Sequence, residues 1–455
     1  MNGKSEKLIR ILAFTLAFSY MSATMFHFVL PEIGKEFRLT FAQVSWVSTG
    51  YLLIYAIGTV LYGKLADRYP LKQLITVGLL IFIAGSVVGL AAQTYETLLA
   101  GRMLQAAGAA VIPGTAMIIP VRYFPEETRG RALGITATGL ALGSVLGPIV
   151  SALIVSVVHW RWLFVLPMFI VVTLPYYRKY LDDDSGNRGR IDWLGGGLLA
   201  CTVALLLLAI TNGDWRYAGG GAAAFILFLL RVSRAADPFI PVSLFRMSSY
   251  TLGVATVVLM TGVSYALPFL TPLLMAEVHH LEPAWIGLVM VPAAAASVML
   301  GRKGGRLADK KGNAALYAVA SSLIMTGFLL LSLFADLPPI AVAGLLIFGN
   351  VGQTFMQISL SNAVSRTLPK AQVGVGMGMM GMLNFMSGAI AASLYSTIVD
   401  YGSSMRLAPL STNPAAYVYS NIYLVLAVVH VVMLILVAMR AMPFLGRSAG
   451  RSAAG

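Results

Sequence analysis

The sequence has little charge and almost no cysteine. Only 11% of its 455 residues are Asp, Glu, Lys or Arg, whereas 58% are hydrophobic, and the mean hydropathy is +0.81. A soluble domain of this size does not need so much apolar surface, so the composition indicates a polytopic membrane protein. The single cysteine, Cys201, excludes an intrachain disulfide, and we expect it to be a buried free thiol.

Several chemical signatures are also absent from the sequence. It contains no His/Cys cluster with metal spacing, no Gly-x-Ser-x-Gly elbow and no Walker-type phosphate loop. No inner segment is long enough to form a soluble output domain, which argues against a sensor or scaffold. We therefore expect no enzymatic activity, no cofactor and no metal site, and we expect a monomer.

Long apolar windows recur along nearly the whole chain. A membrane-spanning helix needs about 20 predominantly apolar residues, and the N-terminal segment lacks the small-residue cleavage site of a signal peptide, so the first window is read as a retained helix. Fourteen spans are predicted, at 8–30, 41–62, 74–93, 97–121, 132–156, 163–178, 193–211, 217–232, 250–275, 285–301, 314–334, 340–364, 374–398 and 419–440.

The net charge of +14 is distributed unevenly among the predicted loops. If the N-terminus is cytoplasmic, 26 of the 32 Lys and Arg residues lie in inner segments and five lie in outer loops, with Arg102 inside a span. This asymmetry predicts that both termini are cytoplasmic. The positive charge is then a topology signal, and we expect the lipid bilayer to be a partner and nucleic acid not to be one.

A short charged loop occurs twice. The segment from Gly63 to Lys72 is matched 242 residues later by the segment from Gly305 to Gly312. The repeat predicts an internal duplication, with a first half at 1–180, a linker with two extra helices at 181–248 and a second half at 249–455. Its acidic residues can pair with basic neighbours and with a helix N-terminus in one conformation only, so a switch is predicted at Asp67, Arg68 and Asp309. The alternative is ordinary positive-inside charge with a solvated acid.

A row of small residues marks the fifth span. Gly139, Gly143, Gly147 and Ser151 recur every fourth residue and therefore share one helical face. Pro148 removes a backbone hydrogen bond, so we expect a kink or a weakened turn. The face suits a moving contact between helices, and Gly143, Gly147 and Pro148 are assigned to the switch. The alternative is simple tight packing.

Polar and charged side chains within the spans are candidates for a substrate cavity. A guanidinium inside a span costs about 2.5–3.5 kcal/mol on insertion scales, which favours a functional role for Arg102 over snorkelling. Tyrosines of the second span could be interfacial anchors instead, and amides of the twelfth could merely bond neighbouring helices. The predicted lining residues are Tyr51, Tyr55, Arg102, Gln105, Asn350, Gln353 and Gln357. Pro268 and Pro272 are expected to interrupt the ninth span, and Pro292 the tenth.

Three strings resemble motifs A, B and C of the major facilitator superfamily: Gly63 to Lys72, Arg102-x-x-Gln105, and Gly134-x8-Gly143-x3-Gly147-Pro148. The third is similar to the antiporter motif of its drug exporters. Fourteen spans resemble the drug:proton antiporter branch, and the stretches beginning at Arg122, Asp237, Val278 and Tyr419 are closest in pattern to the tetracycline efflux proteins. The resemblance implies an all-α membrane protein of the major facilitator fold, with two six-helix halves and two central linker helices.

The chain departs from that resemblance at the acidic positions. Ala23, Ser144 and Gly388 stand where the tetracycline group carries membrane-embedded glutamates, and no carboxylate lies clearly at mid-membrane. His27, on the first span, could carry a proton instead, because imidazole titrates near physiological pH. The alternative is a neutral, hydrogen-bonded histidine. Glu32, at the outer end of that span, is a second candidate for proton coupling.

The sequence thus predicts a secondary transporter of the plasma membrane. The predicted activity is export of a small amphipathic, drug-like compound by proton antiport with alternating access, and a tetracycline-type antibiotic is the best single guess for the substrate. The alternative is a lipid or metabolite carrier of the same fold without proton coupling.

Overall fold

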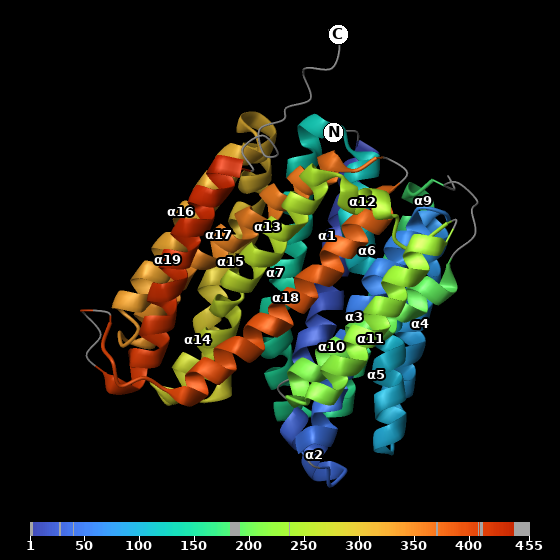
Figure 1. The fold of residues 1–455 in the computed structure, drawn as a ribbon. Coiled ribbons are helices and arrows are strands. Elements are labelled where there is room, and N and C mark those ends of the chain that lie inside the picture. Colours follow the sequence, from blue (N-terminus) through green and yellow to red (C-terminus); the bar gives the residue numbers. More distant parts are fainter. Residues whose placement is uncertain are drawn as a thin grey trace. The chain divides into compact units, whose positions relative to one another are not determined.

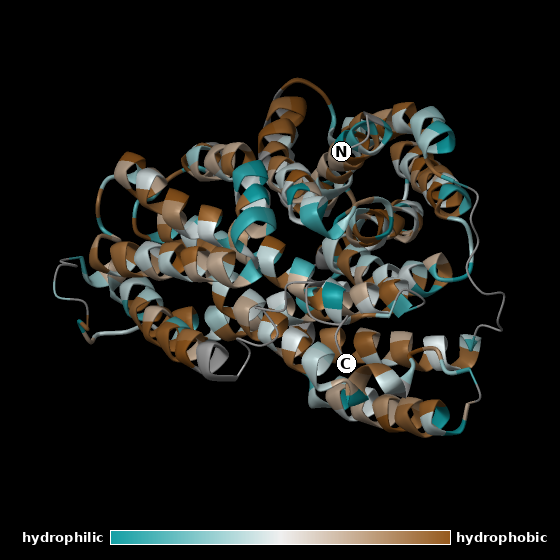
Figure 2. Ribbon diagram, turned by 90° about the horizontal axis from the view of Figure 1, so that it is seen from above, coloured by the Kyte–Doolittle hydropathy of each residue, from teal (hydrophilic) through white to brown (hydrophobic). Residues whose placement is uncertain are grey.

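The computed structural model describes residues 3–26, 29–39, 41–182, 192–235, 237–369, 372–407, 409 and 413–440. Every regular element in these ranges is a helix, as expected for an all-α membrane protein. Thirteen helical segments of the described chain are long and apolar enough to cross a membrane. Apolar residues dominate these helices, and hydrophilic residues form shorter stretches (Figure 2).

The eighth predicted span forms a helix that is not among these thirteen. The window at 217–232 lies in α11 (Trp215–Arg234), which has an arginine near its start and two near its end. Charged residues at both ends and a run of glycines lower its hydropathy, although it packs along α10 (Trp193–Asn212). A two-helix hairpin is therefore present between residues 192 and 235, but a fourteen-span chain remains a prediction.

The chain forms two compact units. The first contains Met1–Tyr123, Leu146–Thr251 and Leu368–Met386. Its helices pack chiefly as α4 on α5, α10 on α11 and α3 on α5 and α6 (Figure 1). They are α1 (Gly3–Met25), α2 (Leu30–Glu36), α3 (Phe41–Ala66), α4 (Leu71–Leu90), α5 (Tyr95–Ala109), α6 (Val111–Tyr123), η2 (Trp160–Phe164), α8 (Val165–Met168), η3 (Phe169–Thr173), α9 (Leu174–Tyr180), α10, α11 and α12 (Val242–Arg246), with parts of α7 (Glu126–Val157) and α18 (Val373–Tyr401).

The second unit contains Phe124–Val145, Leu252–Thr367 and Ser387–Gly455. Here α16 packs on α17 and α19, and α15 packs on α17 (Figure 1). Its helices are α13 (Ser248–Ser264), α14 (Ala266–Glu277), α15 (Pro283–Lys311), α16 (Asn313–Leu333), α17 (Pro339–Thr367), η5 (Pro414–Ala416) and α19 (Tyr417–Arg440), with the remaining parts of α7 and α18.

Glycine allows the closest helix contacts within each unit. A Cβ added at Gly101 of α5 would lie 2.6 Å from the backbone nitrogen of Gly89 on α4. A Cβ added at Gly327 of α16 would lie 2.7 Å from the backbone nitrogen of Gly349 on α17. These backbones can meet only because a side chain is missing, which is the usual arrangement at close helix crossings in membranes.

Helix ends follow local chemistry. Asp192 caps α10 as expected, since its carboxylate accepts a hydrogen bond from the Gly195 amide at 3.0 Å. Thr94 caps α5 in the same manner, through the Thr97 amide. At the far end of α10, Gly213 takes a positive φ of 65°, the left-handed conformation that favours glycine at a helix terminus.

Proline has different effects in different helices. The ninth predicted span divides into α13 and α14 just before Pro268, as expected, but the expected interruption at Pro272 is wrong, because α14 continues through that residue. The expected interruption at Pro292 is wrong, because α15 continues through that residue as one helix; a proline removes only one backbone bond, and neighbouring turns can maintain the helix. The α7 helix also runs through position 148 without a break. The sixth predicted span instead consists of four short pieces, η2, α8, η3 and α9.

The expectation of a buried thiol at Cys201 is also wrong. Cys201 is exposed in the structure. It lies on α10, whose packing partner α11 covers only one side of the helix. A position on an apolar helix predicts contact with either protein or lipid, and periodicity alone did not separate the two.

Candidate functional site

The first unit contains a fully buried arginine. Arg102 of α5 is 0% exposed and does not extend toward a helix end. Its Nε donates to the Val47 carbonyl at 3.4 Å, and its Nη1 donates to the Ser22 carbonyl at 3.3 Å and to Gln105 Oε1 at 2.6 Å. Gln105 Nε2 in turn donates to Ser86 Oγ at 2.7 Å. One guanidinium therefore connects α5 with α1, α3 and α4.

Aromatic rings cover the guanidinium. Its carbon lies 4.1 Å from the centroid of the Phe26 ring and 4.0 Å from that of Tyr51. A cation over a ring face is stabilised by the ring quadrupole, especially when water is excluded. Tyr51 stacks on Tyr55 at 5.9 Å, and Tyr55 meets Phe385 edge-on at 5.2 Å. The structure thus brings together four of the predicted lining residues, Tyr51, Tyr55, Arg102 and Gln105.

Several polar atoms of this network have unused hydrogen-bonding capacity. Among the described residues, Arg102 Nη2 makes no hydrogen bond, the buried Tyr51 and Ser22 hydroxyls have only each other, and the Ser19 hydroxyl has only that of Tyr55. Buried polar groups are normally satisfied by protein, water or a ligand. Within the described residues Arg102 also has no carboxylate partner. The network therefore retains free donors and acceptors, and its positive charge is not neutralised.

The remaining predicted lining residues lie on α17, in the second unit. Asn350 is half-buried and donates from Nδ2 to the Leu346 carbonyl of its own helix at 3.0 Å. Gln353 and Gln357 are half-buried on the same helix. The Asn350 amide thus bonds within its own helix and not to a neighbouring one.

The first copy of the repeated loop binds the beginning of α18. Asp67 accepts hydrogen bonds from the Gly374 amide at Oδ1 and from the Val375 amide at Oδ2, both at 2.8 Å. Arg122 Nη2 lies 3.0 Å from Asp67 Oδ1. Burial raises the pKa of Asp67, while the two amides and Arg122 lower it and leave a net rise. A carboxylate is favoured at this end of a helix because the first amides lack partners within the helix.

The second copy of the loop binds the beginning of α7. Asp309 accepts hydrogen bonds from the Gly130 amide at Oδ1, at 2.7 Å, and from the Arg131 amide at Oδ2, at 2.8 Å. The backbones lie so close that a Cβ at Gly130 would be 2.7 Å from the Gly305 carbonyl oxygen. Both copies therefore place a carboxylate across two consecutive amides, with one oxygen on each.

The two contacts are reciprocal along the chain. The early loop at Asp67 holds a late helix at Gly374, and the late loop at Asp309 holds an early helix at Gly130. Sequence analysis identified the two aspartates from the repeat but did not identify their amide partners. The only local indication was the glycine at each contact, which permits the close approach.

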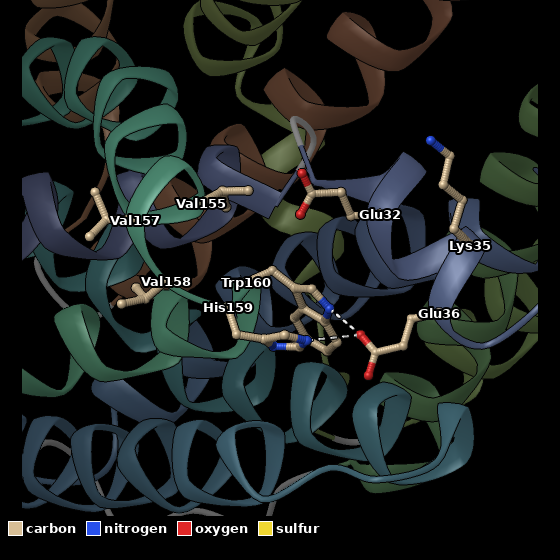
Figure 3. Close-up of a pocket in the computed structure, with 8 residues that line it drawn as sticks. All are labelled: Glu32, Lys35, Glu36, Val155, Val157, Val158, His159 and Trp160. Carbon is tan, nitrogen blue, oxygen red and sulfur yellow. Dashed lines mark hydrogen bonds and ion pairs between the residues drawn. The ribbon is translucent and has the colours of Figure 1, made fainter.

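A third polar cluster lies at the end of α2. Trp160 Nε1 donates to Glu36 Oε2 at 2.6 Å, and His159 Nε2 lies 3.2 Å from the same oxygen (Figure 3). Arg161 Nη2 lies 2.8 Å from Glu36 Oε1. Burial raises the pKa of Glu36, but the hydrogen bonds from Trp160 and Arg161 outweigh it, so the pKa lies below that of an ordinary glutamate. Glu36 is thus held as a carboxylate.

This cluster borders an open pocket of about 720 Å³. The pocket is lined by Glu32, Lys35, Glu36, Val155, Val157, Val158, His159 and Trp160. In Figure 3 the Glu32 carboxylate points toward the side of Val155, while the Lys35 ammonium points away from the pocket. Glu32, a predicted proton-coupling residue, is therefore an exposed carboxylate at a pocket rim.

The other predicted residues have varied positions. His27 lies outside the described residues, as does the side chain of Pro148. Gly143 is buried, and a Cβ at Gly147 would overlap Thr24 Oγ1 of α1. Arg68 is half-buried, and its Nη1 makes no hydrogen bond with the described residues.

Sequence analysis missed His430. It lies in the middle of α19, is 0% exposed, and neither ring nitrogen makes a hydrogen bond with the described residues. An ionisable side chain inside an apolar span is by itself a signal of function. His430 is the single His, Asp, Glu, Lys or Arg in the predicted span 419–440 before its final arginine, so the signal was available.

Comparison with known proteins identifies the family. A riboflavin transporter, RibZ of Clostridioides difficile, is 26% identical over 83% of this chain and 85% of its own length. The multidrug resistance protein Stp of Mycobacterium tuberculosis is 25% identical over 86% of this chain and 75% of its own length. A methylenomycin A resistance protein of Bacillus subtilis is 25% identical over 74% of this chain and 74% of its own length. The human organic anion transporter MFSD10 has the same fold, with a TM-score of 0.64, 13% identity, and coverage of 94% of this chain and 99% of its own. The model of the Major Facilitator Superfamily matches residues 12–392, and the chain belongs to that family of membrane transporters.

Proposed function

We propose that this transporter exports small amphipathic, drug-like compounds across the plasma membrane by proton antiport. The reciprocal contacts of Asp67 and Asp309 carry the mechanistic part of the proposal. Each is a charge-assisted contact between a short loop and a helix that lies far away in the chain. Such a contact can be complete in one conformation and broken in another, as alternating access requires.

The Arg102 network is proposed to form part of the substrate site. It is a buried cation under two aromatic rings, beside groups that have unused hydrogen-bonding capacity among the described residues. A compound with an aromatic or apolar body and a few polar groups would complement those features. Asn350, Gln353 and Gln357, which are half-buried on α17, are also proposed as substrate-binding residues.

The switch also includes α7 in this proposal. Gly147 permits contact with Thr24 of α1, and Gly143 and Pro148 belong to the same helix. Arg68, next to Asp67, adds positive charge beside the loop contact. Both termini are proposed to be cytoplasmic because of the distribution of basic residues, and the protein is proposed to act as a monomer.

Drug export is favoured by two relatives that are named for resistance to multiple drugs and to methylenomycin A. Among single compounds, a tetracycline-type antibiotic is the proposed substrate, on the resemblance of the sequence. Proton coupling is proposed through His27 or Glu32, because the acidic positions of the tetracycline group are occupied by other residues.

A second candidate function is a metabolite or lipid carrier without proton coupling. The relative with the riboflavin transporter name favours a metabolite. The absence of a carboxylate at the three acidic positions of the tetracycline group favours the lack of coupling.

One experiment separates these functions. Purified protein would be reconstituted into proteoliposomes containing a pH-sensitive dye and challenged with tetracycline, ethidium, riboflavin and a fluorescent lipid. Proton antiport of drugs predicts transport of tetracycline or ethidium with a matching proton flux in the opposite direction. Transport of riboflavin or lipid that is indifferent to an imposed pH gradient would support the carrier, and no transport of any compound would refute both proposals for this panel.

A further inference from the structure

His430 on α19 is a buried imidazole with both nitrogens free. It is 0% exposed, and neither Nδ1 nor Nε2 makes a hydrogen bond with the described residues. A neutral imidazole offers one donor and one acceptor. Leaving this donor and this acceptor without hydrogen bonds in a membrane-spanning segment is costly, because neither lipid nor bulk water satisfies them there. The side chain thus requires a bound water or another polar partner.

The contacts between α19 and α16 show what lies opposite. The Phe328 and Tyr423 rings stack with centroids 6.1 Å apart, and Ser420 Oγ donates to the Ser332 carbonyl. Residue numbers rise along α19 from one contact to the next while they fall along α16, so the two helices are antiparallel (Figure 1). His430 is seven residues, or about 10 Å, beyond Tyr423 on nearly the same face. Seven residues back from Phe328 on α16 is Ser321, which therefore lies level with His430.

The facing side of α16 has further unsatisfied polar groups. The buried hydroxyls of Ser321 and Tyr317 have no hydrogen-bond partner among the described residues other than each other. Tyr317 is one turn from Ser321, and Asn313 is one turn further, at the end of α16 next to the Asp309 loop. Asn313 bonds to Asn362 at 2.9 Å and to Ser359 at 2.8 Å. Polar groups thus follow one another at four-residue intervals from that end of α16 to the level of His430.

The opposite end of α19 has the other titratable groups that face this helix. Tyr423 contacts Thr271 of α14 at 3.3 Å, and the Tyr419 hydroxyl donates to Glu277 at 2.5 Å. Glu277 therefore meets α19 eleven residues, or about 16 Å, from the level of His430. On the two helices that pack against α19, the titratable side chains are Tyr317 of α16 and Glu277 of α14. Tyr317 is the one on the same side of Tyr423 as His430.

We propose that His430 is an intramembrane proton-binding residue of the transport cycle, reached along the row Asn313, Tyr317 and Ser321. The inference rests on the proposed proton antiport and supplies a coupling group for it. Among the described residues no charged side chain faces His430 at its own level, and its burial separates it from both aqueous phases. A group of this kind changes charge only when conformation or hydration changes, which links proton binding to transport.

The step is a simple proton transfer. A proton from water on the outer, acidic side binds the free nitrogen of the neutral imidazole, where it forms a second N–H bond. Release of one proton along the Ser321 and Tyr317 hydroxyls to water at the cytoplasmic end of the row, beside Asn313, restores the neutral ring. Ser321 and Tyr317 each accept one hydrogen bond and donate another during the transfer, so no group other than His430 changes its net charge.

The test compares exchange with gradient-driven accumulation in proteoliposomes, with tetracycline and ethidium as probes. Exchange of labelled for unlabelled compound at equal pH needs substrate binding and conformational change but no proton gradient. We expect His430→Gln to exchange the compounds at nearly the wild-type rate. The accumulation that an imposed pH gradient drives should fall by a factor of about five or more, which is the lower end of typical coupling between two sites. Tyr317→Phe, which retains the ring but not the hydroxyl, should reduce the same accumulation by a smaller factor.

His280→Gln is the matched control, because His280 is exposed and receives the same substitution. Undiminished accumulation by His430→Gln would overturn the inference, and so would equal loss of exchange and accumulation in a monodisperse variant. If His430→Gln aggregates, His430→Asn is subjected to the same criteria. Wild-type vesicles that exchange neither compound would refute the proposed function itself, whereas a failure limited to the His430 comparison would leave that function intact.

Discussion

Replacing Asp67 by asparagine tests the reciprocal loop contacts. The carboxylate holds two backbone amides, one on each oxygen, and lies beside Arg122. Asparagine has nearly the same shape but only one acceptor oxygen. Its NH₂ group would face a second N–H donor, and the attraction to Arg122 would be lost.

The size of the effect follows from these contacts. A hydrogen bond to a charged group contributes about 1.5–3 kcal/mol, and a buried group left without its partner adds a desolvation cost. Since the Asp67 side chain is only 9% exposed, water cannot easily replace the lost bond. We expect Asp67→Asn to weaken the attachment of α18 to the loop by about 2–4 kcal/mol.

Hydrogen exchange measures this attachment directly. The amides of Gly374 and Val375 donate to Asp67, so their deuterium uptake reports on the contact. A loss of about 2 kcal/mol corresponds to an increase of about 30-fold in opening. The same variant should transport at least tenfold more slowly, because a rate change of that size needs only about 1.4 kcal/mol.

The control and the refuting result are both specific. Asp182→Asn makes the same chemical change at an exposed aspartate and should leave both measurements unchanged. Asp309→Asn should reproduce the effect at the amides of Gly130 and Arg131. If Asp67→Asn and Asp309→Asn both showed wild-type exchange and transport, the contacts would be incidental and the switch would be refuted.

Three further predictions concern other parts of the chain. Gly147→Leu should abolish transport while the protein still inserts in the membrane, since a side chain there overlaps Thr24 Oγ1; transport in proteoliposomes checks this. Arg102→Lys should reduce transport about tenfold or more, because an ammonium cannot reproduce the forked hydrogen bonds or the planar stacking, and substrate titration shows whether binding is affected. For Glu36 the folded pKa is lowered, so its stabilisation is present above the ordinary carboxyl range and is lost as pH falls through the folded pKa. The melting temperature of the wild-type protein should therefore fall more between neutral pH and a pH below about 4 than that of Glu36→Gln does.

Two of these predictions have a control within the chain. Gly197→Leu adds the same side chain at a position on α10 with nothing within 4 Å of the new Cβ, so it should transport normally. Glu32→Gln removes an exposed carboxylate near Glu36 that, among the described residues, makes no hydrogen bond or ion pair in the Trp160 cluster, and this variant should retain the wild-type acid sensitivity. Normal transport by Gly147→Leu would contradict the close contact, and unchanged transport by Arg102→Lys would show that only the charge matters.

The fold was predictable because it depends on hydropathy. Apolar windows predicted an all-helical membrane protein, and the structure confirms this. Details that depend on single backbone bonds were less accessible: Pro292 leaves α15 intact, whereas the ninth span divides before Pro268. A proline's effect depends on whether neighbouring turns can maintain the helix, and that information lies outside the local sequence.

The candidate site was predictable only within single helices. The three-residue spacing of Arg102 and Gln105 placed them on one face, and the structure brings them within 2.6 Å. Their partners Ser22 and Ser86 come from other helices and have no signature of their own. The same reason hid the amide partners of the two aspartates, since any backbone can supply an N–H group.

The reciprocal loop contacts have a consequence for how such a chain could have arisen. If each copy of the repeat supplies an acidic loop and also the helix that receives the other copy's loop, then one copy alone satisfies neither. A half-length ancestor could complete both contacts only by pairing with a second copy of itself about a two-fold axis. Fusion of two such subunits would preserve the pairing, and afterwards each half could diverge only while it continued to fit the other.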